Sequence, residues 1–467
     1  MPSLKTHTAA QKRAFLNQLK SFLDLYGYEW RETSVLEPSD LFLTRAGDQI
    51  IDRLLTFEHM GQDLALRPEF TATAAHDYIA LPQTNSIIRW QFSGPIFEYD
   101  TTLLSIQQQE SVGAELFGMS SIAADAEMIA VGVQAIHQLG IQNWTLTLGN
   151  IALLRVALKQ FDLDPRTERY LLNHIHELRN PARGADYVIQ QLDRLLGSAS
   201  LPAEPADMAF SDLLNTENEE SHTRQLLDVL LDATQRGVTM GGRTRHDIAR
   251  RLLEKRQRAA QRPQILQAIQ WLTDWCGIYD MPETAFEQMQ SQLQNADHAQ
   301  WQPILDVWKT LTHLLVAYGI PEEKIMLQPA RDRNWDYYTG IVFDIQANDQ
   351  LLAGGGRYDG LTQLLGGNES IPAVGIAFYL DAIMNVASAG METSPILTLV
   401  FTQANLIHTI QWGEHLRKHG LRVELVDLAD SSPQLTAIVT DDGLLEFRET
   451  QYAIEDTSNL IGLILGA

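Results

Sequence analysis

Apolar and polar positions change their period several times along the chain. Residues 8–26 repeat apolar side chains at helical spacing among good helix formers, and Gly27 ends this predicted amphipathic helix. From there to about residue 160 the pattern is rich in short strand-like runs, with helices predicted at Ile122–Leu139 and Ile151–Phe161. This mixture of strands and helices predicts an α+β core.

The middle of the chain follows a different pattern, because residues 165–310 are polar, helical and interrupted by prolines and glycines. Within them, Leu226–Leu231 is an apolar stretch that we expect to be buried. The strand-rich pattern then resumes, and after it an apolar strand, a helix and a second strand precede a short helix at Leu428–Gln434. The predicted regions are a first core segment at 1–164, a helical insertion at 165–310, a second core segment at 311–390 and a small α/β piece at 391–467.

Two neighbouring segments, Arg333–Gly340 and Gly354–Gly360, each bring arginine together with tyrosine, aspartate and glycine. Ile341–Ile345 between them has the β-branched and aromatic content of a strand, and Asn348-Asp349 suits a tight turn. We therefore predict two strands, of which the second ends in a glycine-rich bend, with side chains that surround a small polar molecule. A nucleotide P-loop is a poor fit, because no Gly-Lys-Ser/Thr follows the glycines.

These two segments resemble the histidine-recognition signatures of histidyl-tRNA synthetases and their paralogues, usually written Arg-Gly-Leu-Asp-Tyr-Tyr and Gly-Gly-Arg-Tyr-Asp-Gly-Leu. The second fits fully, and the first fits except for Asn334-Trp335 in place of Gly-Leu. Further matches follow in the family's order at Leu66–Ala72, Ser93–Phe97, Val112–Gly118, Thr145–Ile151 and Ala373–Ala377. The resemblance implies an antiparallel sheet core of the class II aminoacyl-tRNA synthetase type with flanking helices. It also implies a helical insertion and a degenerate C-terminal α/β piece of the anticodon-binding type.

The same resemblance implies a histidine pocket. Its candidate residues are Glu69, Thr71, Glu115, Arg333, Tyr338 and Tyr358. In the family the first glutamate and the threonine hold the amino group, the second glutamate and both tyrosines contact the ring, and the arginine faces the carboxylate. These pairings are chemically sound. Ser111 in place of a pocket glutamine and Phe70 in place of a glycine depart from the family pattern, so a relict pocket that binds nothing is the alternative.

The arginines with which class II synthetases hold ATP are missing where the resemblance places them. Glu98 stands at the motif 2 arginine, and Asp381-Ala382 stands at the Glu-Arg of motif 3. Thr101–Gln109, the motif 2 loop, contains no Lys or Arg. At about 4 Å and an effective dielectric near 20, unit charges exchange about 4 kcal/mol, so a carboxylate repels phosphate as strongly as an arginine attracts it. We therefore expect no catalytic residue and no adenylate formation.

Composition bears on the remaining partners. With 35 Lys+Arg against 59 Asp+Glu, the chain has a formal net charge of −24, which is unfavourable for tRNA. Beyond Arg422 the only basic residue is Arg448, so we expect the C-terminal piece not to bind RNA. The single Cys276 suits a reducing cytosol, and no apolar run is long enough to predict a membrane span. No cofactor and no metal site are predicted.

A histidine pocket without ATP-binding arginines points to one group of paralogues, the regulatory subunits of ATP phosphoribosyltransferase. This resemblance implies a non-catalytic, cytoplasmic protein of the first step of histidine biosynthesis. Its implied partners are a short-form catalytic subunit, a second copy of itself in a dimer within a hetero-oligomer, and free histidine. One alternative is a diverged histidyl-tRNA synthetase or other histidine-activating ligase that uses Arg89 or Arg357 instead. The other is a scaffold that binds no small molecule.

Overall fold

The structure is a computed structural model, and it describes a defined part of the chain. The described residues are 9–43, 51–81, 87–101, 103–180, 182–196, 261–331, 333, 337–387, 396–402, 404–419, 421–427, 436–448, 450–454 and 460. The chain forms two compact units, one of residues 18–386 and one of residues 387–467 together with 1–17. The predicted helical insertion lies within the larger unit, and the predicted C-terminal piece lies within the smaller one.

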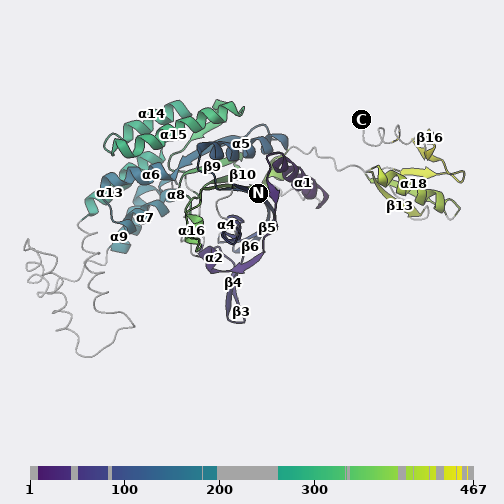
Figure 1. Ribbon diagram of the computed structural model, residues 1–467, viewed down its shortest axis with the longest axis horizontal. Helices are drawn as coiled ribbons and strands as arrows, with labels where there is room; N and C mark the ends of the chain where they lie inside the picture. Colours follow the sequence, from purple (N-terminus) through teal and green to yellow (C-terminus); the bar gives the residue numbers. More distant parts are fainter. Residues whose placement is uncertain are drawn as a thin grey trace, which may run out of the picture. The chain divides into compact units, whose positions relative to one another are not determined.

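An eight-stranded sheet forms the centre of the larger unit (Figure 1). In spatial order its strands are β1 (Glu29–Trp30), β5 (Ile88–Asp100), β6 (Ser105–Phe117), β11 (Ala373–Tyr379), β10 (Gln350–Arg357), β9 (Ile341–Ala347), β7 (Thr145–Asn150) and β8 (Ile325–Leu327). All neighbours are antiparallel except the edge pairs β1–β5 and β7–β8, which are parallel. This arrangement confirms the predicted α+β fold.

The strands β9 and β10 form the hairpin that the sequence predicts. Asn348 and Asp349 at its turn have φ angles of 50° and 60°, the left-handed conformation that a tight turn between twisted strands requires. The glycines differ from the prediction: Gly354–Gly356 lie inside β10 and pair with β9 on one side and β11 on the other. They are part of the sheet rather than a bend at the end of a strand.

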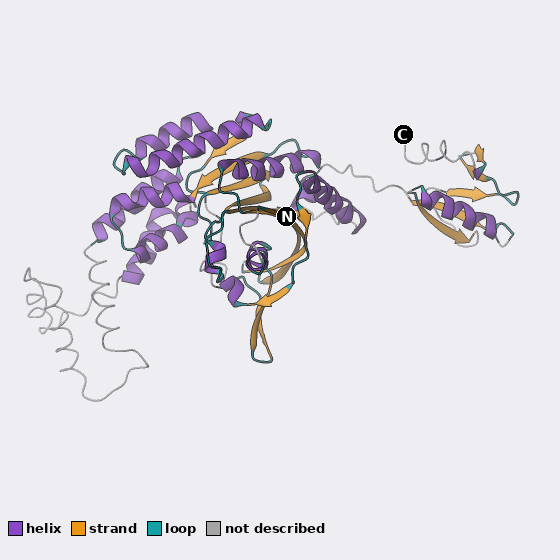
Figure 2. Ribbon diagram, in the orientation of Figure 1, coloured by secondary structure: helices purple, strands orange, loops and turns teal. Residues whose placement is uncertain are grey.

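Helices cover both faces of this sheet (Figures 1 and 2). On the inner, concave side lies α4 (Thr71–Ile79), and on the outer side lies α5 (Ile122–Gln138). A Cβ at Gly132 of α5 would lie 2.5 Å from the Cδ1 of Ile376 and 2.9 Å from that of Ile345, so this helix packs tightly on β11 and β9. The other helices of this unit are residues 18–25 of α1 (Ala9–Leu25), α2 (Asp40–Leu43), α6 (Ile151–Leu158) with η1 (Lys159–Phe161), η2 (Glu322–Lys324), α16 (Leu361–Leu364) and α17 (Leu380–Val386).

The predicted helical stretch is helical where the structure describes it. Its helices are α7 (Pro165–Asn173), α8 (Ile175–Arg179), α9 (Gly184–Leu196), α13 (Arg262–Cys276), α14 (Pro282–Gln292) and α15 (His298–Ala317). Trp275 and Trp308 are fully buried in it, and the Trp308 ring meets Phe286 edge-on at 5.8 Å. Helix α15 continues through residue 310, where the sequence placed a boundary, and the predicted apolar stretch Leu226–Leu231 lies outside the described residues. A separate insertion domain stays a prediction.

A small three-stranded sheet extends from the core as a hairpin visible in Figure 1. Its strands are β2 (Leu36–Pro38), β4 (Gln62–Leu66) and β3 (Thr56–His59), and Met60-Gly61 forms the turn. The backbone N–H groups of Phe97 and Tyr99 in β5 donate to the carbonyls of Arg67 and Arg53, at 3.0 and 2.8 Å. These bonds hold the segment that contains Arg53 beside β5.

The smaller unit confirms the predicted strand–helix–strand start of the C-terminal piece. Its sheet has the order β13 (Arg422–Asp427), β12 (Ile396–Phe401), β14 (Thr436–Val439), β15 (Leu445–Phe447) and β16 (Thr450–Tyr452), and its helix α18 spans Leu406–Lys418. Trp412 of α18 is 1% exposed in its core. The predicted short helix at Leu428–Gln434 lies outside the described residues. Among the helices that are described, none is both long and apolar enough to span a bilayer.

Candidate functional site

A cavity of about 280 Å³ lies among strands β5, β6, β9, β10 and β11 and the start of α4, close to the size of a small-molecule site. All the candidate residues named from the sequence line it: Glu69, Thr71, Glu115, Arg333, Tyr338 and Tyr358. Arg53 and Arg331 line it as well, although the sequence did not single them out. The structure therefore gathers residues that are separated by up to several hundred positions in the chain.

Two glycines let charged side chains lie against the sheet inside this cavity. Gly375 stands opposite Glu115 across β11 and β6, and a Cβ on Gly375 would overlap the Glu115 carboxylate. A Cβ on Gly354 would likewise overlap the guanidinium of Arg333. Because a side chain at either position would fill this space, the glycines form the floor of the cavity.

Glu115 is the most deeply buried acid of the cavity, with 2% of its surface exposed. The Thr71 hydroxyl donates to its Oε1 at 2.6 Å, and the Tyr358 hydroxyl donates to its Oε2. Burial raises the pKa of Glu115 to about 8, against the opposing effect of these two hydrogen bonds and with a further rise from the charge of Glu69. At neutral pH the side chain is therefore mostly protonated, and a nearby cationic group would favour release of this proton.

Glu69 serves the local fold at the same time as it lines the cavity. Its carboxylate accepts hydrogen bonds from the backbone N–H of Thr71 and, at 2.8 Å, from that of Ala72. These are orphan donors in the first turn of α4, where a carboxylate also complements the helix dipole. Burial raises the pKa of Glu69, and the bonds to the helix oppose that rise. The expected contact with a ligand's amino group would use the remaining lone pairs of a carboxylate that is already fixed in place.

At the other end of the cavity, two arginines share one carboxylate. Arg333 donates to Asp344 and, at 3.0 Å, to the hydroxyl of Tyr379, while Arg331 donates to the other Asp344 oxygen at 2.6 Å. One positive charge is therefore left over in a buried site. Beside them, burial raises the pKa of Tyr338 to about 12, although the charge of Arg333 opposes the rise, so this phenol stays neutral.

The position where class II synthetases carry the motif 2 arginine belongs to an internal ion pair. Glu98 pairs with Arg53, and both line the cavity. On β6, Gln107 and Gln109 contribute amides to the same wall, and the Ser111 hydroxyl donates to the carbonyl of Phe378 at 3.0 Å. The negative charge of Glu98, which the sequence places at the position of an arginine, is thus neutralised by Arg53 of the same chain.

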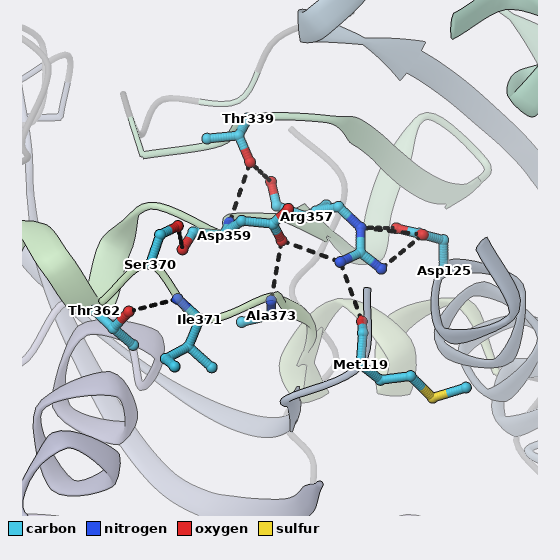
Figure 3. A network of polar contacts seen from close by, with 9 residues as sticks. All are labelled: Met119, Asp125, Thr339, Arg357, Asp359, Thr362, Ser370, Ile371 and Ala373. Carbon is cyan, nitrogen blue, oxygen red and sulfur yellow. Dashed lines mark hydrogen bonds and ion pairs between the residues drawn. The ribbon is translucent and has the colours of Figure 1, made fainter. Parts of the chain in front are cut away.

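Arg357, the last residue of β10, organises a polar network (Figure 3). Its guanidinium makes two parallel bonds to Asp125 of α5, with Nε to Oδ1 at 2.8 Å and Nη2 to Oδ2 at 2.7 Å. Its Nη1 donates to Asp359 at 3.0 Å, and the same Asp359 oxygen accepts from the backbone N–H of Ala373 at 3.0 Å. This network fixes the end of β10, and with it the backbone that carries the cavity-lining tyrosine.

The described residues hold no group of three or more His, Cys, Asp or Glu side chains arranged to bind a metal ion.

Comparison with known proteins places this geometry in a family. The model of a family described as histidyl-tRNA synthetase matches residues 3–235 and 243–383. The chain belongs to the histidyl-tRNA synthetase family. Among its curated relatives, the ATP phosphoribosyltransferase regulatory subunit of Brucella anthropi is 28% identical over 378 residues, covering 79% of this chain and 95% of the relative. The protein of the same name from Mesorhizobium japonicum is 29% identical over 379 residues, with coverage of 75% and 91%.

Solved structures of the histidyl-tRNA synthetase family share the fold. The histidyl-tRNA synthetase of Nostoc aligns with a TM-score of 0.64 at 16% identity, over 99% of this chain and 98% of that one. An ATP phosphoribosyltransferase regulatory subunit/histidyl-tRNA synthetase from Bacillus halodurans aligns with a TM-score of 0.61 at 17% identity, over 94% and 97%. At these identities the likeness concerns the fold alone.

Within this family, the two arginines considered as replacements for the missing ATP ligands have other partners. Arg89 is bound to Glu127 at 3.0 Å, and Arg357 is held by the network described above. Neither is among the described residues that line the cavity. Ala382 lies in α17, and the adjacent Asp381 accepts from the backbone N–H of Glu110 at 3.3 Å. Neither Arg89 nor Arg357 is therefore placed to hold a nucleotide in this cavity.

Proposed function

We propose that this chain is a regulatory subunit of ATP phosphoribosyltransferase that activates a short-form catalytic subunit in the first step of histidine biosynthesis. The curated relatives that carry this name support the proposal, because their own length is matched almost completely. The observation that carries it is the Glu98–Arg53 ion pair, which lines the cavity at the position where the resemblance expects the motif 2 arginine of an adenylating enzyme. The chain then acts through assembly, in the cytoplasm, and forms no adenylate itself.

The charges of the cavity support an amino acid rather than a nucleotide as its ligand. A triphosphate needs several fixed cations, but Arg53 is neutralised by Glu98. Arg331 and Arg333 together exceed Asp344 by one positive charge, which matches the single carboxylate of a free amino acid. We therefore propose free histidine as the ligand, with its carboxylate at this end.

The other end of the cavity suits an imidazole. Glu115 is flanked by the hydroxyls of Thr71 and Tyr358, so its carboxyl group is oriented and partly shielded from water. A ring nitrogen placed here shares a proton with a carboxyl group whose pKa lies near 8. Histidine bound in this way stabilises one arrangement of the sheet, and it regulates the catalytic subunit if that arrangement binds the subunit differently, typically by about 1–3 kcal/mol.

We further propose that the chain pairs with a second copy of itself through the edge of the core. Trp30, Val35 and Leu36, in and between β1 and β2, are 45%, 38% and 41% exposed, so this edge of the core presents three large apolar side chains to water. A dimer that covers these positions would remove them from water. The mass of the purified chain in solution, measured by light scattering, tests this part of the proposal.

Reconstitution tests the main proposal. Purified short-form catalytic subunit is assayed for transfer of the phosphoribosyl group to ATP, alone and with this chain, over a series of histidine concentrations. We expect the chain to raise the activity and histidine to lower it. In parallel, the chain alone is assayed for histidine-dependent exchange of pyrophosphate into ATP, where we expect no signal.

Each alternative has its own outcome in this experiment. Histidine-dependent pyrophosphate exchange would establish a diverged synthetase and reject the regulatory role. Activation of the catalytic subunit without any heat of histidine binding in calorimetry, and without any effect of Glu115→Gln, would favour a scaffold that binds no small molecule. No activation at all would reject both the regulatory subunit and the scaffold.

A further inference from the structure

The hairpin formed by β5 and β6 has one face on the cavity and another face in solvent. Successive strand residues point to opposite faces, and Gln107 and Gln109 of β6 line the cavity. Ile106 points the other way and is 63% exposed. At the tip of the hairpin Leu103 and Leu104 are 66% and 72% exposed. Three large apolar side chains are therefore presented to water on the element that forms one wall of the cavity.

The backbone conformation at Leu104, at the tip of the hairpin, is one that a leucine side chain disfavours. Leu104 has a φ of 51°, in the left-handed region that glycine and asparagine adopt readily and that a bulky residue adopts only under strain. The Asp100 carboxylate fixes this turn, because it accepts from the backbone N–H of Leu103 at 2.8 Å. Leu104 therefore combines backbone strain with exposure to water, and a contact with another molecule would remove its apolar side chain from water.

The charges around the tip decide what kind of surface fits it. The sequence from Thr101 to Gln109 contains no Lys or Arg, while Asp100 and Glu110 lie at its two ends in a chain of net charge −24. A second copy of the same hairpin would bring carboxylates against carboxylates. A complementary surface is apolar at its centre and bordered by lysine or arginine.

We infer that the tip of the β5–β6 hairpin, made of Leu103, Leu104 and Ile106, docks on the short-form catalytic subunit in an apolar depression with a basic rim. This inference rests on the proposed function, since it assigns a surface to the partner named there. It also links the two sites: Gln107 and Gln109 line the cavity, so a ligand that contacts them would touch the same hairpin whose tip the partner holds. The partner and the ligand are then coupled through one element rather than through the whole fold.

The sharpest test is the substitution Leu104→Asn. Asparagine adopts the left-handed conformation readily, so we expect the free chain to melt at the same or a higher temperature. Affinity for the catalytic subunit, measured by surface plasmon resonance or calorimetry, should fall by about tenfold or more, as for the loss of a buried apolar anchor. A contact that merely supported the fold would change stability and affinity in the same direction.

A matched control is available on the neighbouring hairpin. Met60 has a φ of 52° and is 91% exposed, so Met60→Asn relieves the same strain at a comparable apolar residue. We expect it to raise the melting temperature without changing affinity for the catalytic subunit. A second variant, Leu103→Ser, should weaken the complex as Leu104→Asn does, and higher salt should weaken the complex of the unmodified chain.

The outcomes separate this inference from the proposed function. If the unmodified chain does not bind the catalytic subunit, the proposed function itself fails. If it binds and both leucine variants bind equally well, the function stands and the docking surface is rejected. Equal loss of affinity in Met60→Asn would also reject this hairpin as the specific site. A change of self-association in Leu104→Asn, with the catalytic subunit still bound normally, would assign the tip to a second copy of the chain.

Discussion

The buried carboxyl group of Glu115 makes a quantitative prediction about how stability depends on pH. Its pKa is about 8 in the folded chain, against an ordinary value of 4.5. In the unfolded chain the group therefore loses its proton earlier as the pH rises. The contribution of Glu115 to the free energy of unfolding is therefore fully present below about pH 4.5. It falls as the pH rises between the two pKa values and is lost above about pH 8.

The magnitude follows from the slope of this dependence. Within the window, one proton difference changes the free energy of unfolding by about 1.4 kcal/mol per pH unit. Between pH 5.5 and 7.5 the unmodified chain should lose roughly 3 kcal/mol through this group, as an upper bound, because the cavity can rearrange or admit water. Glu115→Gln keeps a side chain of the same shape but cannot ionise, so this part of the loss disappears.

Urea unfolding of both chains at the two pH values, followed by circular dichroism, measures the difference. The other titratable groups are the same in both chains, so their contributions to the difference in stability largely cancel. Glu69 interacts with Glu115, so its pKa changes slightly between the two chains. We expect Glu115→Gln to be less stable than or similar to the unmodified chain at pH 5.5 and to become relatively more stable at pH 7.5. A difference in stability that is the same at both pH values would refute the assignment of a buried, protonated carboxyl group to this position.

Other consequences concern the floor and the supports of the cavity. Gly375→Ala should abolish histidine binding in calorimetry and cost about 1–3 kcal/mol of stability, because the new methyl overlaps the Glu115 carboxylate. Arg333→Lys should weaken histidine binding by about tenfold while the chain stays folded, because an ammonium cannot bind Asp344 and a ligand carboxylate in the same fork. Arg357→Ala should cost about 3–5 kcal/mol in urea unfolding, since it leaves the buried carboxylate of Asp125 unpaired.

Each of these has a control or a contradicting result. Gly140→Ala is the control, because it places a methyl group at a left-handed backbone position with no neighbouring atom within 4 Å. It should lower the stability of the chain without changing histidine binding. Histidine binding that survives Gly375→Ala would contradict the geometry of the cavity. Equal affinity of Arg333→Lys and the unmodified chain would remove the carboxylate from that end of the cavity. For Arg357, the double variant with Asp125→Asn should recover part of the loss, and a purely additive double variant would contradict the ion pair.

Much of the fold could be predicted because its signals are local. Helical periodicity identified α1, α5 and the continuous pair α6 and η1 within one residue at each end, since it reflects only which side chains face the core. The turn residues Asn348-Asp349 identified the hairpin of β9 and β10 for the same reason. The glycines of β10 were misjudged as a bend, because glycine signals a special backbone without saying whether neighbouring strands or solvent require it.

By itself, the sequence determined the α+β class, six of the residues that line the cavity and the reversal of charge at Glu98. Each of these lies in a short motif whose order along the chain is sufficient to recognise it. Only the tertiary structure decided that Glu98 is neutralised by Arg53, and that two arginines share Asp344. It also decided that Gly375 stands opposite Glu115. These facts depend on which strands are neighbours and in what register, and residues far apart in the chain carry no local signal of the partner that folding brings to them.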